Sequence, residues 1–429
     1  MTLNLMIFGF LVLCSLGMPV AYAIGFTGLV ILLLDGSVPL VLAPQRMFVM
    51  VNSFGLMAVP FFLLAGEFMN TGGITKRLVN FTDTLVGHIR GGLAHVCVVS
   101  NMFMAGVSGS SAADTAAIGG LLIPAMIKKG YDRNFSVAIC CSAGCLGPII
   151  PPSIIMIIYG SLSGVSIGAL FLGGVVPGVI IGGGLMVVSY VFGRTGRFVA
   201  APRTRAPIAE VWQALKEAGL ALLLPVVILG GILSGVFTPT EAGAVAAVLS
   251  LFLGVCVYKE IRPRDIPAVV LKAASSTAVV ILLGATAAIF GWILAKNQFG
   301  DHALAAMQRI TTNPTGILLL ILLLFLIAGC FIDTFASTIL LVPVLHPVAV
   351  QLGFDPIFFG VISTILIVIG GLTPPMAPLL YIAAAIAESP SLDALPLVML
   401  LIAAMLVCVG VLVCFPALVT FLPHAVFRL

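Results

Sequence analysis

Charged residues are scarce in this chain. They make up 8% of its 429 residues, whereas about 25% is usual in soluble globular domains, so a soluble globular protein is excluded. The basic residues form no cluster that would suggest a nucleic-acid partner. The five histidines and nine cysteines lack the CxxC pairs and the histidine spacing of a metal site. No lysine or arginine precedes the first apolar run, so we expect an uncleaved segment there and no signal peptide.

The sequence has long apolar runs instead. Hydrophobic residues make up 61% of the chain and the mean hydropathy is +1.27, which predicts an all-α polytopic membrane protein. Residues 1–34 are either one kinked helix or two short spans, and we favour two, because the second half also has three spans before its polar turn. Polar stretches at 75–92 and near 300–312 are predicted to be arms at the membrane interface. The other predicted spans are residues 54–72, 167–192, 217–236, 241–258, 273–295 and 394–416.

Two polar turns interrupt the apolar sequence. The first, from Gly106 to Thr115, holds three serines and Asp114, and ionisable groups at membrane depth are costly and mark function. Its flanks, 93–107 and 115–127, have ~15 residues each. That is about 20 Å of helix, too short to cross ~30 Å of hydrocarbon. The sequence therefore predicts a re-entrant helical hairpin over 93–127, and a second over 315–351 with its turn at Asp333-Thr334.

The two turns belong to an internal repeat. Asp114-Thr115 recurs as Asp333-Thr334 at a shift of 333 − 114 = 219, whereas Gly147 and Gly370 match at a shift of 370 − 147 = 223. Four inserted residues would explain the change of shift. Glycine and proline then interrupt the apolar segment of each half, 134–161 and 356–386, and helices must break there. Repeats of this kind are typical of secondary transporters.

The two halves are predicted to be inverted repeats, residues 1–192 and 217–429, joined by a cytoplasmic connector at 193–216. Each half has an odd number of spans, so the second half enters the membrane with the opposite orientation. We place both termini outside, and the first hairpin then enters from the cytoplasm and the second from the opposite face. This arrangement follows the positive-inside rule, because only four of the 19 lysines and arginines then lie outside: Arg46, Lys296, Arg309 and Arg428.

The turns and the helix breaks together offer ligands for a small hard cation. Free carbonyl groups and serine or threonine hydroxyls suit sodium, while half-helix N-termini favour an anionic group of a substrate. Asp114 and Asp333 could also be N-caps of the helices that follow them. The serines could simply be helix-packing residues. Glu241 is expected to cap a helix, and a proton-carrying role for Glu67 or Glu241 stays open.

A rival interpretation comes from another functional class. Gly106-Val107-Ser108-Gly109 fits the GxSG pattern around the nucleophile of intramembrane serine proteases, whose serine needs a histidine base. His346 is the only candidate at a plausible depth. The protease hypothesis leaves the repeat, the second hairpin and both proline breaks unexplained.

The chain resembles the large membrane subunit of tripartite ATP-independent periplasmic (TRAP) transporters. The resemblance covers nearly the whole chain and rests on Val59–Asn70, Gly106–Thr115, Gly147–Ser153 and Gly370–Pro375. It implies an elevator-type transporter of the bacterial inner membrane, in which sodium drives the uptake of an organic acid. It also implies two partners, a small four-helix membrane subunit and a soluble periplasmic substrate-binding protein. A stand-alone sodium/anion symporter of related fold is the alternative.

The resemblance also implies site residues, and the sodium ions would be the only bound cofactors. The proposed transport core has no lysine or arginine at mid-depth, so a carboxylate would have to be bound by helix N-termini, hydroxyls and sodium itself. One sodium site would comprise Ser110, Ser111, Asp114, Gly147, Pro151 and Ser153. The other would comprise Asp333, Thr334, Ser337, Thr338, Gly370, Thr373 and Pro375. The substrate-binding residues would be Ser108, Ser110, Pro152, Ser153, Thr373 and Pro374.

Overall fold

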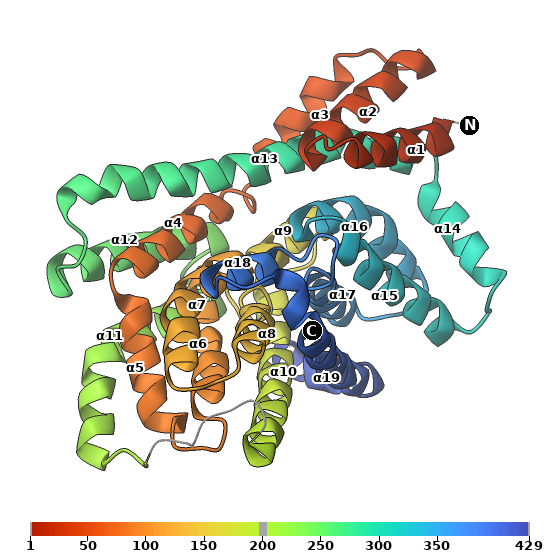
Figure 1. The fold of residues 1–429 in the computed structure, drawn as a ribbon. Coiled ribbons are helices and arrows are strands. Elements are labelled where there is room, and N and C mark those ends of the chain that lie inside the picture. The colour runs from red at the N-terminus through yellow and green to blue at the C-terminus, as the bar shows by residue number, and fades with distance from the viewer. Residues whose placement is uncertain (1, 197–203, 428–429) are drawn as a thin grey trace.

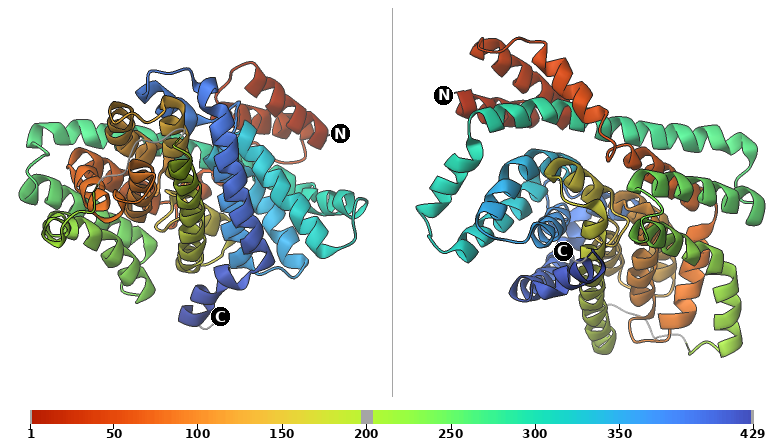
Figure 2. Two further views of the ribbon diagram at one scale, coloured as in Figure 1. Left: turned by 60° about the horizontal axis from the view of Figure 1, so that its bottom comes forward. Right: turned by 180° about the vertical axis from the view of Figure 1, so that it is seen from behind.

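The computed structural model describes residues 2–196 and 204–427, and within these ranges it contains helices and no strand. Seven of its helices are long and apolar enough to cross a membrane. Figure 1 shows a long helix lying beside the first helices of the chain along one edge of the molecule, with the remaining helices packed below. The view from behind in Figure 2 shows the same division. The prediction of an all-α polytopic membrane protein is confirmed.

The first 35 residues form two separate helices. Helices α1 (Thr2–Ser15) and α2 (Val20–Asp35) pack against each other. The chain reverses between them at Gly17, which has φ +86°, a conformation that glycine adopts without strain. Two separate helices are therefore present instead of one kinked helix, but neither is among the helices long enough to cross a membrane, so the prediction of two spans is confirmed only as to the number of helices.

The next stretch differs from the prediction of a third span at 54–72. Helix α3 (Leu42–Val51) was not predicted, and helix α4 (Ala58–Thr71) has only 14 residues. That is about 21 Å of helix, short of the ~30 Å hydrocarbon core. The predicted arm that follows is helix α5 (Ile74–Val86).

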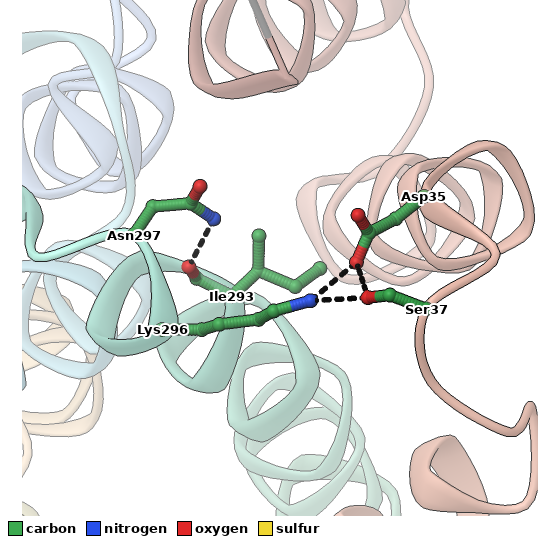
Figure 3. A network of polar contacts seen from close by, with 5 residues as sticks. All are labelled: Asp35, Ser37, Ile293, Lys296 and Asn297. Atoms are coloured by element: carbon green, nitrogen blue, oxygen red, sulfur yellow. Dashed lines mark hydrogen bonds and ion pairs between the residues drawn. The ribbon is translucent and has the colours of Figure 1, made fainter.

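The second half has a matching set of outer helices. They are α11 (Ile208–Leu233), α12 (Pro239–Phe252), which a π-helical turn extends to Val257, α13 (Ile266–Lys296) and α14 (Phe299–Gln308). These helices and α1–α5 are called the scaffold below. Within it, α4 packs against α12, and α2 and α3 pack against α13. Figure 3 shows one bond between the halves, in which the Lys296 ammonium lies 2.5 Å from Asp35 and 2.6 Å from the Ser37 hydroxyl.

The connector predicted at 193–216 is too long. Arg194 lies in helix α10 (Ile167–Thr195), and residues 208–216 form the first turns of α11. Both helices therefore extend into the predicted connector. Part of the predicted connector, including Arg197, Pro202 and Arg203, lies outside the described residues.

The predicted hairpins and broken helices are confirmed as helix pairs. In the first half the hairpin is α6 (Gly92–Ser108) and α7 (Ser111–Lys128), and the broken helix is α8 (Arg133–Gly144) and α9 (Ile154–Ser163). In the second half they are α15 (Pro314–Phe331), α16 (Thr334–Gln351), α17 (Pro356–Gly370) and α18 (Pro378–Ile386). Nearly every residue of α8 and α17 is buried, so the broken helices form the centre of the core. Helix α19 (Leu395–Cys414) is the predicted last span, and α20 (Ala417–Phe427) was not predicted.

The structural register of the repeat is a constant 223 residues through the hairpins and the helices that follow. Both ends of α16 lie 223 residues beyond the ends of α7, since 334 − 111 = 223 and 351 − 128 = 223. The same shift relates the C-terminal ends of α6 and α15, and of α9 and α18. The four-residue insertion is therefore wrong. The Asp-Thr match at 219 is one helical turn out of register, because four residues nearly complete a turn of 3.6 residues.

The core helices of the two halves exchange partners. Helix α9, after the first break, packs against α16 of the second hairpin, and helix α18, after the second break, packs against α7 of the first. Each hairpin is therefore held by its own broken helix and by that of the other half.

Candidate functional site

The tip of the first hairpin is a tight turn of two residues, Gly109 and Ser110. Gly109 has φ +60°, and a Cβ atom there would lie 2.7 Å from the carbonyl oxygen of Pro152. Glycine therefore allows both the turn and the close approach of the break. Ser110 is the N-cap of α7, and its hydroxyl accepts a hydrogen bond from the Ala113 amide at 3.4 Å.

Asp114 is not the N-cap of α7, so the capping hypothesis is wrong for this residue. It lies in the first turn of the helix, and it is fully buried. The Ser108 hydroxyl donates to its Oδ1 atom at 2.5 Å. Its Oδ2 atom is buried and has no hydrogen-bond partner among the described residues, and the same is true of the Oγ1 atom of the neighbouring Thr115. A buried carboxylate oxygen without a partner is costly.

Two glycines of the first broken helix face these unpaired oxygens. A Cβ atom at Gly147 would lie 2.7 Å from Asp114 Oδ2 and 3.1 Å from the Ser111 amide nitrogen. A Cβ atom at Gly144 would lie 1.9 Å from Thr115 Oγ1. The structure therefore brings the predicted residues of the tip together with Gly147. Thr115 and Gly144 were missed as site residues, although Thr115 stood beside Asp114 in the repeat.

The remaining predicted residues of the first half lie in the break itself. Ser153 is buried and caps α9, accepting a hydrogen bond from the Met156 amide at 3.2 Å and donating one to the Pro148 carbonyl. Pro151 and Pro152 are buried and joined by a cis peptide bond. The break side of the first candidate site is therefore buried, whereas Ser110 and Ser111 at the tip are half-buried.

The tip of the second hairpin is built differently. Asp333 is the N-cap of α16, and its Oδ1 atom accepts a hydrogen bond from the Phe335 amide at 2.9 Å, so the capping hypothesis is confirmed here. In the register of 223, Asp333 corresponds to Ser110, and Ser337 corresponds to Asp114. The Ser337 hydroxyl donates to the Ile332 carbonyl at 3.3 Å, and the Thr338 hydroxyl donates to the Thr334 carbonyl at 2.8 Å. When the two repeats are aligned, the carboxylate of the second tip therefore lies four residues, about one helical turn, before the position of Asp114.

The second break lies close to this tip and is more open than the first. A Cβ atom at Gly371 would lie 3.4 Å from Thr334 Oγ1, and one at Gly370 would lie 3.0 Å from the Cα atom of Gly329. Thr373 and Pro374 are half-buried and Pro375 is exposed. Several backbone groups are already paired: the Thr373 amide donates to Gly370 at 2.8 Å, the Met376 amide to Cys330 at 3.3 Å, and the Tyr381 hydroxyl to Pro375 at 3.0 Å.

A pocket of about 250 Å³ lies between the first hairpin tip and the scaffold helices α4 and α13. Ser108 and Ser110 line it on the hairpin side. On the scaffold side, Glu67 of α4 pairs with Lys272 of α13 at 2.9 Å. Lys272 was not predicted as a site residue, since the predicted topology only places it among the basic residues on the inside. No local pattern indicates its position, because the contact joins residues 205 positions apart, 272 − 67.

Hydrogen bonds test two further hypotheses, the serine–histidine pair and the Glu241 cap. The Ser108 hydroxyl is bonded to Asp114, whereas His346 is bonded to the hydroxyl of Tyr159 at 2.7 Å. The pairing of Ser108 with a His346 base is therefore wrong. Glu241 forms a capping box with Thr238 at the start of α12, as expected for a capping residue.

The comparison with known families shows to which family the chain belongs. The model of the DctM component of the tripartite ATP-independent periplasmic transporters matches residues 7–418. The chain belongs to this family. It is therefore a multi-pass transport permease of the bacterial inner membrane, which serves the secondary uptake of organic acids. Membership of the family implies that the chain has two partners, a small permease and a periplasmic binding protein.

Relatives of this DctM-family chain differ in the substrate that their names carry. The sialic acid TRAP transporter large permease protein SiaM of Vibrio cholerae is 42% identical over 90% of each chain. The C4-dicarboxylate TRAP transporter large permease protein DctM of Pseudomonas aeruginosa is 40% identical over 83% of this chain and 84% of that protein. The 2,3-diketo-L-gulonate TRAP transporter large permease protein YiaN of Escherichia coli is 37% identical over 87% of this chain and 88% of that protein.

Two solved structures share the fold at low sequence identity. The YdaH transporter of Alcanivorax borkumensis is 16% identical, with a TM-score of 0.59 over 86% of this chain and 87% of that one. MtrF of Neisseria gonorrhoeae is 13% identical, with a TM-score of 0.63 over 89% of this chain and 84% of that one.

Proposed function

We propose that this chain couples the uptake of an organic acid to sodium, with one sodium site at the first hairpin tip. The observation that carries the proposal is the fully buried Asp114 carboxylate, whose Oδ2 atom has no hydrogen-bond partner in the part of the chain that the structure describes. Such a group is stable when ionised only if it is paired or binds a cation.

The surroundings of Asp114 suit sodium. Hard cations take carboxylate, hydroxyl and carbonyl oxygens as ligands. Asp114 and Thr115 each present a buried oxygen that is unpaired among the described residues, and the glycines Gly144 and Gly147 let the backbone of the first break approach both oxygens closely. The backbone of Ser110 and Ser111 lies against Gly147. These groups would hold the ion without a second charged residue.

We propose a second sodium site at the tip of the second hairpin, with Asp333, Thr334, Ser337 and Thr338 facing Gly370, Thr373 and Pro375. Asp333 already receives an amide hydrogen bond as an N-cap, and both helix hydroxyls already donate to carbonyls. This site therefore offers a carboxylate that is partly neutralised. The two sites should differ in affinity, with the first binding sodium more tightly.

We also propose an elevator mechanism for the transport step. The cross-packing of α9 with α16 and of α18 with α7 ties both hairpins and both broken helices into one unit, which would move as a body against the scaffold. The inverted repeats, residues 1–192 and 217–429, would supply equivalent halves of that unit. Both termini would lie outside and the connector inside the cell.

The substrate is proposed to be a carboxylate, as in the names of the relatives. It would bind between the tips and the breaks, at Ser108, Ser110, Pro152, Ser153, Thr373 and Pro374. The partners would be a small four-helix membrane subunit and a soluble periplasmic binding protein that delivers the acid.

Reconstitution in proteoliposomes tests the proposed function. The three-part complex should accumulate the acid that co-purifies with its binding protein when sodium is applied outside, and this chain alone should not. Robust uptake by this chain alone would instead identify a stand-alone sodium/anion symporter. Uptake driven by a pH gradient without sodium would overturn the coupling.

A further inference from the structure

The pocket beneath the first hairpin tip is bounded by two bodies of the fold. The hairpin contributes Ser108 and Ser110, and the scaffold contributes Glu67, Lys272 and Ser276. Lys272 and Ser276 are four residues apart on α13, so they lie on the same face of that helix. The volume of about 250 Å³ is close to the lower end of the range of ligand sites, which suits a small organic acid.

The ion pair in this pocket is asymmetric. The Lys272 side chain is 69% exposed, whereas the Glu67 side chain is 14% exposed. Glu67 therefore forms part of the pocket wall, and the Lys272 ammonium that pairs with it is the more exposed of the two groups. A pair with one such exposed partner contributes little to folding stability.

We propose that Lys272 binds the carboxylate of the substrate on the scaffold side of this pocket, and that Glu67 weakens this binding so that the acid can leave. This inference rests on the proposed function and adds a charged partner to it. An ammonium has three donors on a flexible stem, so Lys272 can hold Glu67 and a second carboxylate together. The Ser276 and Ser110 hydroxyls would donate to the same anion, because Ser110 only accepts a hydrogen bond in the hairpin. The Glu67 carboxylate would repel it.

This arrangement predicts opposite effects from the two members of one ion pair. In Lys272→Gln the affinity of the purified membrane complex for the acid should fall about tenfold, because the cation is lost. In Glu67→Gln the affinity should rise about threefold, because the competing anion is lost. Residues that form only a structural salt bridge would shift in the same direction, since either change breaks the pair.

Binding is measured by calorimetry in saturating sodium, without the binding protein, with four probes used separately: N-acetylneuraminate, succinate, pyruvate and gluconate. The probe that the parent complex binds most tightly is then titrated into each variant. Arg77 and Glu260 form a matched control pair at 2.9 Å that does not line the pocket. Arg77→Gln and Glu260→Gln should leave the affinity unchanged. Melting temperatures of all variants report folding.

The outcomes separate this inference from the proposed function. Opposite shifts in the two variants support the role of Lys272. Shifts of the same sign, or no shift, overturn it and leave the sodium-coupled uptake standing. If the parent complex binds none of the four acids, the inference fails, while the choice of a carboxylate substrate is tested separately by the acid that co-purifies with the binding protein.

Discussion

Replacing Asp114 by asparagine should weaken sodium binding at the first hairpin tip about a hundredfold. Asparagine has the same shape and keeps an oxygen for the Ser108 hydroxyl, which lies 2.5 Å from the native carboxylate. The change therefore removes the charge and converts the unpaired Oδ2 atom into an amide group. The fold should tolerate the substitution, because it removes a buried charge that no other charged group neutralises.

The size of the effect follows from the strength of charged interactions. A hydrogen bond to a charged group contributes about 1.5–3 kcal/mol, and about 2.7 kcal/mol corresponds to about a hundredfold change in affinity. At a sodium concentration about a hundred times the parent dissociation constant, the first site stabilises the parent by about 2.7 kcal/mol. With a hundredfold weaker site the same sodium contributes about 0.4 kcal/mol.

The assay is thermal unfolding of the purified complex in sodium chloride and in choline chloride at equal ionic strength. The melting temperature of the parent should rise in sodium, and most of that rise should be absent in Asp114→Asn. In choline the variant should melt at the parent temperature or above it. Asp333→Asn is the matched control, because its side chain keeps a capping oxygen, and it should keep the larger part of the rise. An equal rise in the parent and in Asp114→Asn would refute the reasoning.

Three further predictions concern the site, the topology and the partners. Gly147→Ala should abolish sodium-dependent uptake, because its Cβ atom would lie 2.7 Å from Asp114 Oδ2, while Gly183→Ala on α10, with no atom within 4 Å of its Cβ position, should transport normally; equal loss in both would exclude a specific effect. A cysteine at Thr204, in a chain without its native cysteines, should react with a membrane-impermeant reagent only after the cells are opened. Labelling in intact cells would contradict the inverted repeats. Omitting either the small subunit or the binding protein from proteoliposomes should reduce uptake to background, and retained uptake would show that the missing partner is not needed.

The hairpins and broken helices could be predicted closely because their signals are local. Glycine, proline and polar residues interrupt apolar sequence at both places, and the helices end within a few residues of the predicted bounds. The register of the two tips was missed. A shift of 219 aligns Asp114 with Asp333, and a shift of 223 aligns Asp114 with Ser337. The two shifts differ by about one helical turn, so the helical pattern of apolar residues is nearly the same at both, and the identical Asp-Thr pair favoured the wrong shift at the tips.

Other features depend on tertiary contacts and leave no local trace. Lys272 reaches the first hairpin tip only because α13 packs beside α4. The unpaired state of Asp114 Oδ2 likewise depends on Ser108 occupying the other oxygen and on Gly147 lying opposite. Helix α4 is short although its sequence is apolar enough for a span, because the chain turns before and after it, at residues 52–57 and at Gly72-Gly73.

The central claim is that sodium occupies the space in front of the Asp114 carboxylate. A high-resolution cryo-electron microscopy map of the complex in sodium chloride, compared with one in choline chloride, tests it directly. The account predicts density in sodium alone, about 2.4 Å from Asp114 Oδ2, the distance typical of hard cations and their oxygen ligands, with Thr115 Oγ1 also in contact. No difference between the two maps at this position, with Asp114 Oδ2 hydrogen-bonded to protein in both, would contradict it.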